Sequence, residues 1–148
     1  EGDIVEVNLE ALHWIEHVAG RLERGYVFTI DYGYTVRERS RFPLGSLMSY
    51  RNHVAREDVL ADLGERDITA HVCFTALEEQ GARFGLETVR FETLARTLLD
   101  AGEADQFSAA LAAASPEEDM RRRLQLKTLL YGMGDTFRVL IQRKRAGQ

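Results

Sequence analysis

The stretch Tyr26-Val27-Phe28-Thr29-Ile30 carries no charge and is rich in β-branched and aromatic residues. This composition predicts a β-strand covered on both faces, as in the layered sheets of α/β proteins. Before it, Asn8 can cap a helix whose apolar positions recur at three- and four-residue steps as far as Leu22. Gly25 is expected to end this helix in the left-handed region. The chain is therefore predicted to begin with a helix and an inner strand.

The rest of the chain alternates predicted helices and strands. The run Ser115-Pro116-Glu117-Glu118 has the arrangement of a capping box with proline at the first helical position. Residues 35–65 show no sustained period, which predicts a functional lid or a segment partly ordered by short helices. Three strands make a thin sheet for 148 residues, so we expect part of a larger sheet. The expected elements are a helix from Asp67 to a break near Gly81 or Gly85, a strand at 86–91, helices at 94–101, 104–114 and from Pro116 to Gly132, and a strand at 137–142.

Composition narrows the class of protein. A chain of 148 residues with one cysteine predicts a single α/β unit, residues 1–148, with no internal disulfide and no cysteine-based zinc site. No apolar run approaches the roughly 18 residues that a transmembrane helix needs, and the formal net charge of −5 argues against nucleic acid as a partner. The chain starts at Glu1 without methionine, and we expect a preceding part to be absent.

The stretch Asp31-Tyr32-Gly33-Tyr34 directly follows the inner strand. Ligands of open α/β sheets bind beyond the carboxyl ends of the strands, so this stretch is a candidate site. Asp31 could accept a hydrogen bond from a bound amine or hydroxyl, Gly33 would let a ligand approach the backbone, and the tyrosines could line a pocket. The alternative is a turn in which Asp31 bonds nearby backbone N–H groups and Gly33 has a positive φ.

Histidine and cysteine are two further residue types that could support chemistry. His71 would lie in the first turn of the helix expected from Asp67, where the macrodipole favours a neutral imidazole that can accept a proton. The alternative is a structural histidine packed beside Asp67. Cys73 is interpreted as a small buried residue, and the pair His13 and His17 as a solvated helix face without metal, because no third ligand accompanies them.

Basic clusters and a glycine pair carry no predicted site. The clusters at 37–41, 121–123 and 143–145 have acidic neighbours or lie at the end of the chain, so we interpret them as solvated charge. Gly132-Met133-Gly134 follows a helix and precedes a strand, the reverse of the strand, glycine loop and helix that cradle a nucleotide. No cofactor-binding loop is therefore predicted within these residues.

Several motifs together resemble the C-terminal half of the MidA family of S-adenosylmethionine-dependent methyltransferases. They are Glu6-Val7-Asn8-Leu9-Glu10-Ala11-Leu12, Ile30-Asp31-Tyr32-Gly33-Tyr34, Gly45-Ser46-Leu47-Met48-Ser49-Tyr50-Arg51 with His53, Asp67-Ile68-Thr69-Ala70-His71-Val72 with Phe74-Thr75, and Met133-Gly134 before Phe137-Arg138-Val139-Leu140. Two positions depart from the family pattern, because Cys73 replaces the usual Asn or Asp and Ser46 the usual Thr. The loss of a polar side chain at Cys73 puts any polar role of that position in doubt.

The resemblance implies a fold and a cofactor. The strand from Tyr26 would be the fifth of a seven-stranded, Rossmann-like class I sheet, residues 86–91 the sixth, and residues 137–142 the antiparallel seventh inserted between them. S-adenosylmethionine would be bound mainly by the N-terminal half, which these residues lack. The isolated chain is therefore expected to be inactive.

The resemblance also implies a substrate and site residues. A related mitochondrial enzyme modifies an arginine of a respiratory complex I subunit, which implies a protein substrate and a location in the bacterial cytoplasm or the mitochondrial matrix. Asp31 and His71 are the implied catalytic residues. The implied substrate-binding residues are Tyr32, Gly33, Tyr34, Tyr50 and His53.

One alternative from a different class stays open. The chain could be a non-catalytic interaction module whose exposed sheet edge pairs with a partner chain. The same edge makes self-association, such as a homodimer, an expectation.

Overall fold

The computed structural model describes residues 5–52, 54–56, 58–62 and 64–147. Its helices are α1 (Leu9–Arg21), the 3₁₀ helix η1 (Val36–Arg41), α2 (Phe74–Arg83), α3 (Leu94–Gly102), α4 (Ser108–Leu111), α5 (Pro116–Lys127) and the π-helix η2 (Thr128–Met133). Its strands are β1 (Gly25–Tyr34), β2 (Met48–Arg51), β3 (Val54–Arg56), β4 (Asp67–Thr69), β5 (Val72–Cys73), β6 (Leu86–Thr93) and β7 (Phe137–Lys144).

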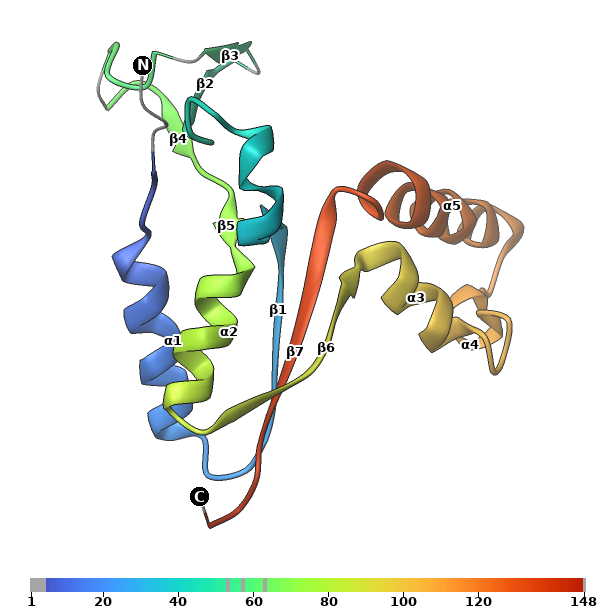
Figure 1. Ribbon diagram of the computed structural model, residues 1–148. Coiled ribbons are helices and arrows are strands. Elements are labelled where there is room, and N and C mark those ends of the chain that lie inside the picture. The colour runs from blue at the N-terminus through green and yellow to red at the C-terminus, as the bar shows by residue number, and fades with distance from the viewer. Residues whose placement is uncertain (1–4, 53, 57, 63, 148) are drawn as a thin grey trace.

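These elements form two sheets and a helical arm. The larger sheet has the order β5-β1-β7-β6, and a small sheet has the order β3-β2-β4. Helices α1 and α2 lie side by side next to the larger sheet, and α3, α4 and α5 form an arm that extends away from it (Figure 1). The predicted α/β class is therefore confirmed, with the small sheet as an addition that the sequence did not predict.

Strand β7 lies between β1 and β6 and is antiparallel to both. Its register places Tyr32 opposite Phe137 on one side and Leu86 opposite Lys144 on the other. The expected insertion of residues 137–142 between the other two strands is thus confirmed. A short parallel pairing of Gly33 with Val72 adds β5 beyond β1.

One face of the larger sheet carries the core. Ile15 and Ala19 of α1 and Phe74 and Leu77 of α2 pack against side chains of β1, β6 and β7, and all four are buried. Asn8 caps α1 as expected, because its side chain accepts a hydrogen bond from the Ala11 N–H at 3.0 Å. Burial of this apolar face is the main driving force that holds the helix pair on the sheet.

The opposite face of β1 is bare. Tyr26, Phe28 and Ile30 are 56%, 59% and 52% exposed, whereas Val27 on the helix-covered face is buried. Successive side chains of a strand point to opposite faces, so the three exposed residues share one side. The expectation that this strand is covered on both faces is wrong for the described residues, because none of their helices packs over these three side chains.

The outer edge of β1 is also largely open. Within the described residues, β5 pairs with β1 only at Gly33 and Tyr34. Residues 25–32 therefore present unpaired backbone groups on the side away from β7. A bare apolar face and an open edge lie on the same strand.

Three helix predictions need correction. Asp67 does not cap a helix, because residues 67–69 form β4 in antiparallel pairing with β2, and α2 begins only at Phe74. The helix expected at 104–114 is reduced to the four residues of α4. Gly25 does not end α1 but opens β1, since Leu22 is the C-terminal cap.

The start of α5 follows the prediction. The Ser115 side chain accepts the Glu118 N–H at 3.2 Å, while the Glu118 carboxylate accepts the Ala114 N–H at 3.0 Å, one residue further back than in the standard capping box. The α-helix ends at Lys127 and continues as η2 to Met133, so the regular helix is shorter than expected. Among the described residues, we find no helix that combines the length and the hydropathy of a membrane-spanning segment.

Candidate functional site

The carboxyl end of β1 places four predicted site residues on two faces. Tyr32 and Tyr34 alternate with Asp31 and Gly33, so the tyrosines lie on one side of the strand and Asp31 on the other. The Asp31 Oδ1 atom accepts the Tyr32 N–H at 2.8 Å. This is a local backbone contact of the kind expected for a turn, although these residues continue the strand.

Five rings form an aromatic cluster, defined as Tyr32, Tyr34, Phe42, His71 and Phe137. The ring centroids of Tyr32 and His71 are 5.2 Å apart at 78°, and those of Phe42 and His71 are 4.8 Å apart at 34°. Tyr34 contacts Phe42 at 5.3 Å, and Phe137 contacts Tyr32 at 5.6 Å. Such pairs add packing energy beyond the area they bury. The structure thus brings Tyr32, Tyr34 and His71 together.

His71 lies in the connection between β4 and β5 and not in a helix. The expectation that a helix macrodipole acts on its imidazole is therefore wrong. Its backbone N–H donates to Ser46 Oγ at 2.9 Å. Its Nδ1 atom is buried and has no hydrogen-bond partner among the described residues. One ring nitrogen of His71 is therefore an unsatisfied polar atom within the aromatic cluster.

Gly33 is required by the close approach of β5. A Cβ atom at this position would overlap the carbonyl oxygen of Val72 and lie 2.8 Å from Phe74 Cε2. The φ of Gly33 is not positive, so the turn alternative is not what requires glycine here. The backbone that approaches Gly33 belongs to the chain itself.

Glu6 anchors the loop between η1 and β2. Its carboxylate accepts the Ser46 N–H at 2.8 Å, the Ser46 hydroxyl at 2.6 Å and the Leu47 N–H at 3.0 Å. Because Ser46 Oγ also accepts the His71 N–H, this one carboxylate connects three segments that are distant in sequence. Ser46 is 4% exposed, so the network is sheltered from solvent.

Glu38 anchors η1 to β7 beside the aromatic cluster. Its carboxylate accepts a hydrogen bond from the Thr35 N–H at 2.9 Å and forms salt bridges with Arg138 at 3.1 Å and Arg41 at 3.2 Å. The hydrogen bond from the Thr35 backbone is the main cause that holds the pKa of Glu38 below its usual value, and the two arginines add to it. Glu38 is therefore ionised throughout the neutral range.

Tyr34 is nearly fully buried at the inner end of the site. Burial raises the pKa of its hydroxyl, and the neighbouring Cys73 and Glu6 raise it further. The phenol therefore stays protonated at neutral pH. Close by, a cavity of about 190 Å³ between α1 and α2 is lined in part by Glu6 and Cys73.

The remaining predicted residues lie apart from the aromatic cluster. Tyr50 lies on β2 of the small sheet, 37% exposed and without a ring contact to the cluster among the described residues. His53 lies outside the described residues. Cys73 is half-buried at the junction of β5 and α2, and His13 and His17 face solvent on α1. The part of the chain that the structure describes holds no group of three potential metal ligands.

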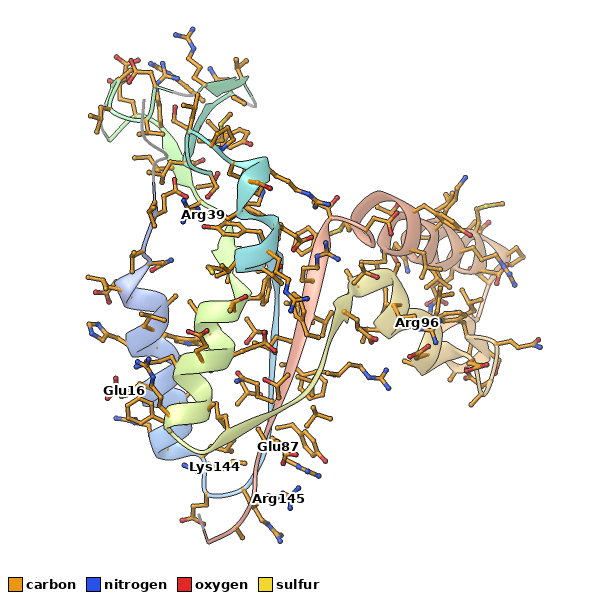
Figure 2. All side chains as sticks on the ribbon, in the orientation of Figure 1. Glu16, Arg39, Glu87, Arg96, Lys144 and Arg145 are labelled. Atoms are coloured by element: carbon orange, nitrogen blue, oxygen red, sulfur yellow. The ribbon has the colours of Figure 1, made fainter. Side chains whose placement is uncertain are left out.

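Charged residues lie at both ends of the larger sheet (Figure 2). Figure 2 shows Arg39 at the end of the sheet that carries η1, whereas Glu87, Lys144 and Arg145 lie together at the opposite end. There the Glu87 carboxylate binds Arg143 at 2.9 Å and Arg145 at 3.0 Å. Those pairs join β6 to the end of β7 and are remote from the candidate site.

Sequence reasoning missed the supporting residues of this site. Glu38 and Phe42 stand in a stretch without periodicity, which offered no signal for either. Glu6 and Ser46 belong to the family motifs, yet their contact depends on chain folding across 40 residues. The motifs were therefore a usable signal that these two positions matter, but not a signal of how they interact.

Comparison with known proteins places this chain in a class of methyltransferase-like α/β proteins. A family model described as "Putative S-adenosyl-L-methionine-dependent methyltransferase" matches residues 1–92, which is more than half of the chain. The chain belongs to this family. No functionally curated protein gives a significant match.

Two solved structures support this membership. A COG1565 superfamily member from Burkholderia thailandensis, bound to S-adenosyl-homocysteine, is 30% identical over 97% of this chain with a TM-score of 0.83. An uncharacterized COG1565 superfamily protein from the same organism is 30% identical over 90% of the chain with a TM-score of 0.77. The chain spans only 38% and 36% of the lengths of these two proteins.

Proposed function

We propose that this chain is the C-terminal, substrate-facing part of an S-adenosylmethionine-dependent methyltransferase of the MidA type. The observation that carries the proposal is the match to the S-adenosyl-homocysteine-bound relative, which extends over nearly the whole chain at a TM-score of 0.83. The aromatic cluster at the carboxyl end of β1 adds support, because ligands of such sheets bind at that end.

The cofactor is proposed to be held mainly by polypeptide outside this chain. Among the described residues, the pair Gly132 and Gly134 lies at η2 before β7, not in a glycine loop between a strand and a helix. Among the described residues, the site offers aromatic rings and a carboxylate, which fits a position beside the cofactor. The bare face and open edge of β1 are where the remaining polypeptide would join.

A protein arginine is the proposed methyl acceptor, and a respiratory complex I subunit the proposed substrate. Adenosylmethionine, when bound, supplies an electrophilic methyl group. A guanidinium must lose a proton to become nucleophilic, and Asp31 is the proposed acceptor of that proton. The proposed role of Tyr32 and His71, whose rings are in contact, is to shape the substrate-binding surface at the same end of β1. The location would be the bacterial cytoplasm or the mitochondrial matrix.

Substitution of Asp31 tests this assignment. In a complete enzyme that contains this segment, Asp31→Asn should lower the rate of methyl transfer at least about 100-fold, the usual contribution of a positioned base, without lowering the melting temperature. Asp135→Asn is the matched control, because Asp135 is exposed and its side chain forms no hydrogen bond or salt bridge among the described residues. Unchanged turnover of Asp31→Asn would exclude Asp31 as the proton acceptor.

A second candidate function is favoured by the open edge of β1. Residues 25–32 could pair with a strand of a partner, which would make the chain a non-catalytic interaction module. The two functions predict different effects of adding the remaining half of the enzyme to this chain. Restored methyl transfer on its addition supports the methyltransferase, whereas partner binding without any restored transfer supports the interaction module.

A further inference from the structure

Helix α5 lies in the arm with a bare apolar face. Among the described residues it contacts chiefly α4 and η2, and none of its side chains is buried. Met120 and Leu124, which lie one helical turn apart, are 60% and 56% exposed. Isolated helices of about 12 residues are marginal in water, so a helix that buries nothing depends on additional contacts.

The spacing along α5 is that of a helix that pairs with another helix. Glu117, Met120, Leu124 and Lys127 follow one another at steps of three, four and three residues, which places them along one seam. An open groove of about 680 Å³ runs beside the first three of them. The seam therefore has an apolar centre with an acidic residue at one end and a basic residue at the other.

Most charges of α5 are already paired within the arm. Glu118 binds Arg122 at 2.7 Å and Arg121 at 3.9 Å, and Asp119 binds Arg123 at 2.8 Å. The arginines near the middle of the helix are therefore compensated.

The two charges at the ends of the seam differ from these. Within the described residues, neither Glu117 nor Lys127 forms an ion pair or a hydrogen bond through its side chain. They are also opposite in sign and lie equally far from the midpoint between Met120 and Leu124.

We infer that α5 pairs antiparallel with α5 of a second copy of this chain, about a two-fold axis between Met120 and Leu124. This register packs Met120 against the partner's Leu124 and places Glu117 beside the partner's Lys127, and symmetry makes each contact twice. The apolar contacts thus lie at the centre of the antiparallel helix pair, and one charged contact lies at each end. The inference does not depend on the methyltransferase assignment.

The size of the seam sets the strength of the dimer. A 12-residue helix is about 18 Å long, so the pair buries less than the roughly 1,200 Å² of a standard interface. We therefore expect a reversible dimer with a micromolar dissociation constant rather than an obligate one.

Charge reversal tests the register directly. Analytical ultracentrifugation should show that Glu117→Lys and Lys127→Glu each raise the dimer dissociation constant at least about tenfold, because each puts like charges together twice. The double variant Glu117→Lys/Lys127→Glu should return the constant to within about threefold of wild type. Both reversals oppose the helix dipole, so recovery in the double variant cannot come from a more stable helix.

Apolar substitutions supply a matched control. Leu124→Asp should abolish dimerisation, whereas Leu60→Asp should leave it unchanged, since Leu60 is 74% exposed and belongs to the connection between β3 and β4, which lies away from the arm (Figure 1). A protein that stays monomeric at all concentrations would overturn the inference. A dimer dissociation constant that neither single reversal changes would also overturn it, and would indicate pairing through the edge of β1. Failure of the double variant to recover would overturn it too, because Glu117 and Lys127 would then not be paired across the interface.

Discussion

Gly33→Ala should unfold the candidate site and destabilise the protein by at least about 3 kcal/mol, the upper range for an overpacked interior. The added methyl group would overlap the Val72 carbonyl oxygen, which is backbone and cannot rotate away. Relief requires β5 to separate from β1, and β5 directly follows His71. The expected result is a lower urea midpoint together with loss of the near-ultraviolet signal from Tyr32.

Gly20→Ala is the matched control for this substitution. Gly20 lies within α1, and a Cβ atom there would have no described heavy atom within 4 Å apart from the neighbouring residues and backbone of its own helix. Alanine is favoured over glycine in a helix by up to about 1 kcal/mol, so this variant should be as stable as wild type or more stable. Equal behaviour of the two variants would contradict the proposed tight contact between β1 and β5.

Glu6→Ala should cost about 2 to 4 kcal/mol, because one ionised carboxylate satisfies three donors of the loop before β2. Its loss leaves the N–H of the nearly buried Ser46 without an acceptor. Ser46 in turn accepts the N–H of His71, so disorder should spread to the aromatic cluster. Hydrogen exchange should therefore accelerate at the amides of Ser46, Leu47 and His71.

Glu10→Ala provides the comparison for Glu6→Ala. Glu10 lies on α1 only four residues away, and its carboxylate is almost fully exposed with a single long contact to His13 at 3.8 Å. Exposed pairs of this kind contribute little to stability. The control should leave exchange at Ser46 and His71 unchanged, and accelerated exchange there in both variants would contradict the anchoring role of Glu6.

The larger sheet could be predicted from local patterns because its long strands carry strong signals. The uncharged run before Asp31 and the apolar end of the chain from Phe137 both have the composition of sheet interiors. The order of the strands came from the family resemblance. By contrast, the bare face of β1 could not be foreseen, since a strand composed for burial does not reveal which segment buries it.

The segment after Asp67 was misread because non-local pairing outweighed local pattern. Asp67, Ile68 and Val72 fit a capped helix, yet residues 67–69 pair with β2 and residues 72–73 with β1. Pairing partners so far apart in sequence leave no local trace. The contact between Tyr32 and His71 could not be predicted for the same reason, because it depends on β5 lying parallel to β1.

Calorimetric titration with S-adenosylmethionine tests the central claim, that this chain is the substrate-facing part of a methyltransferase whose cofactor is held mainly by other polypeptide. The chain alone should give no measurable heat of binding. The same chain combined with the N-terminal half of a MidA-type enzyme should bind the cofactor. Binding by the isolated chain, or no binding by the combination when both parts are folded and associated, would contradict the claim.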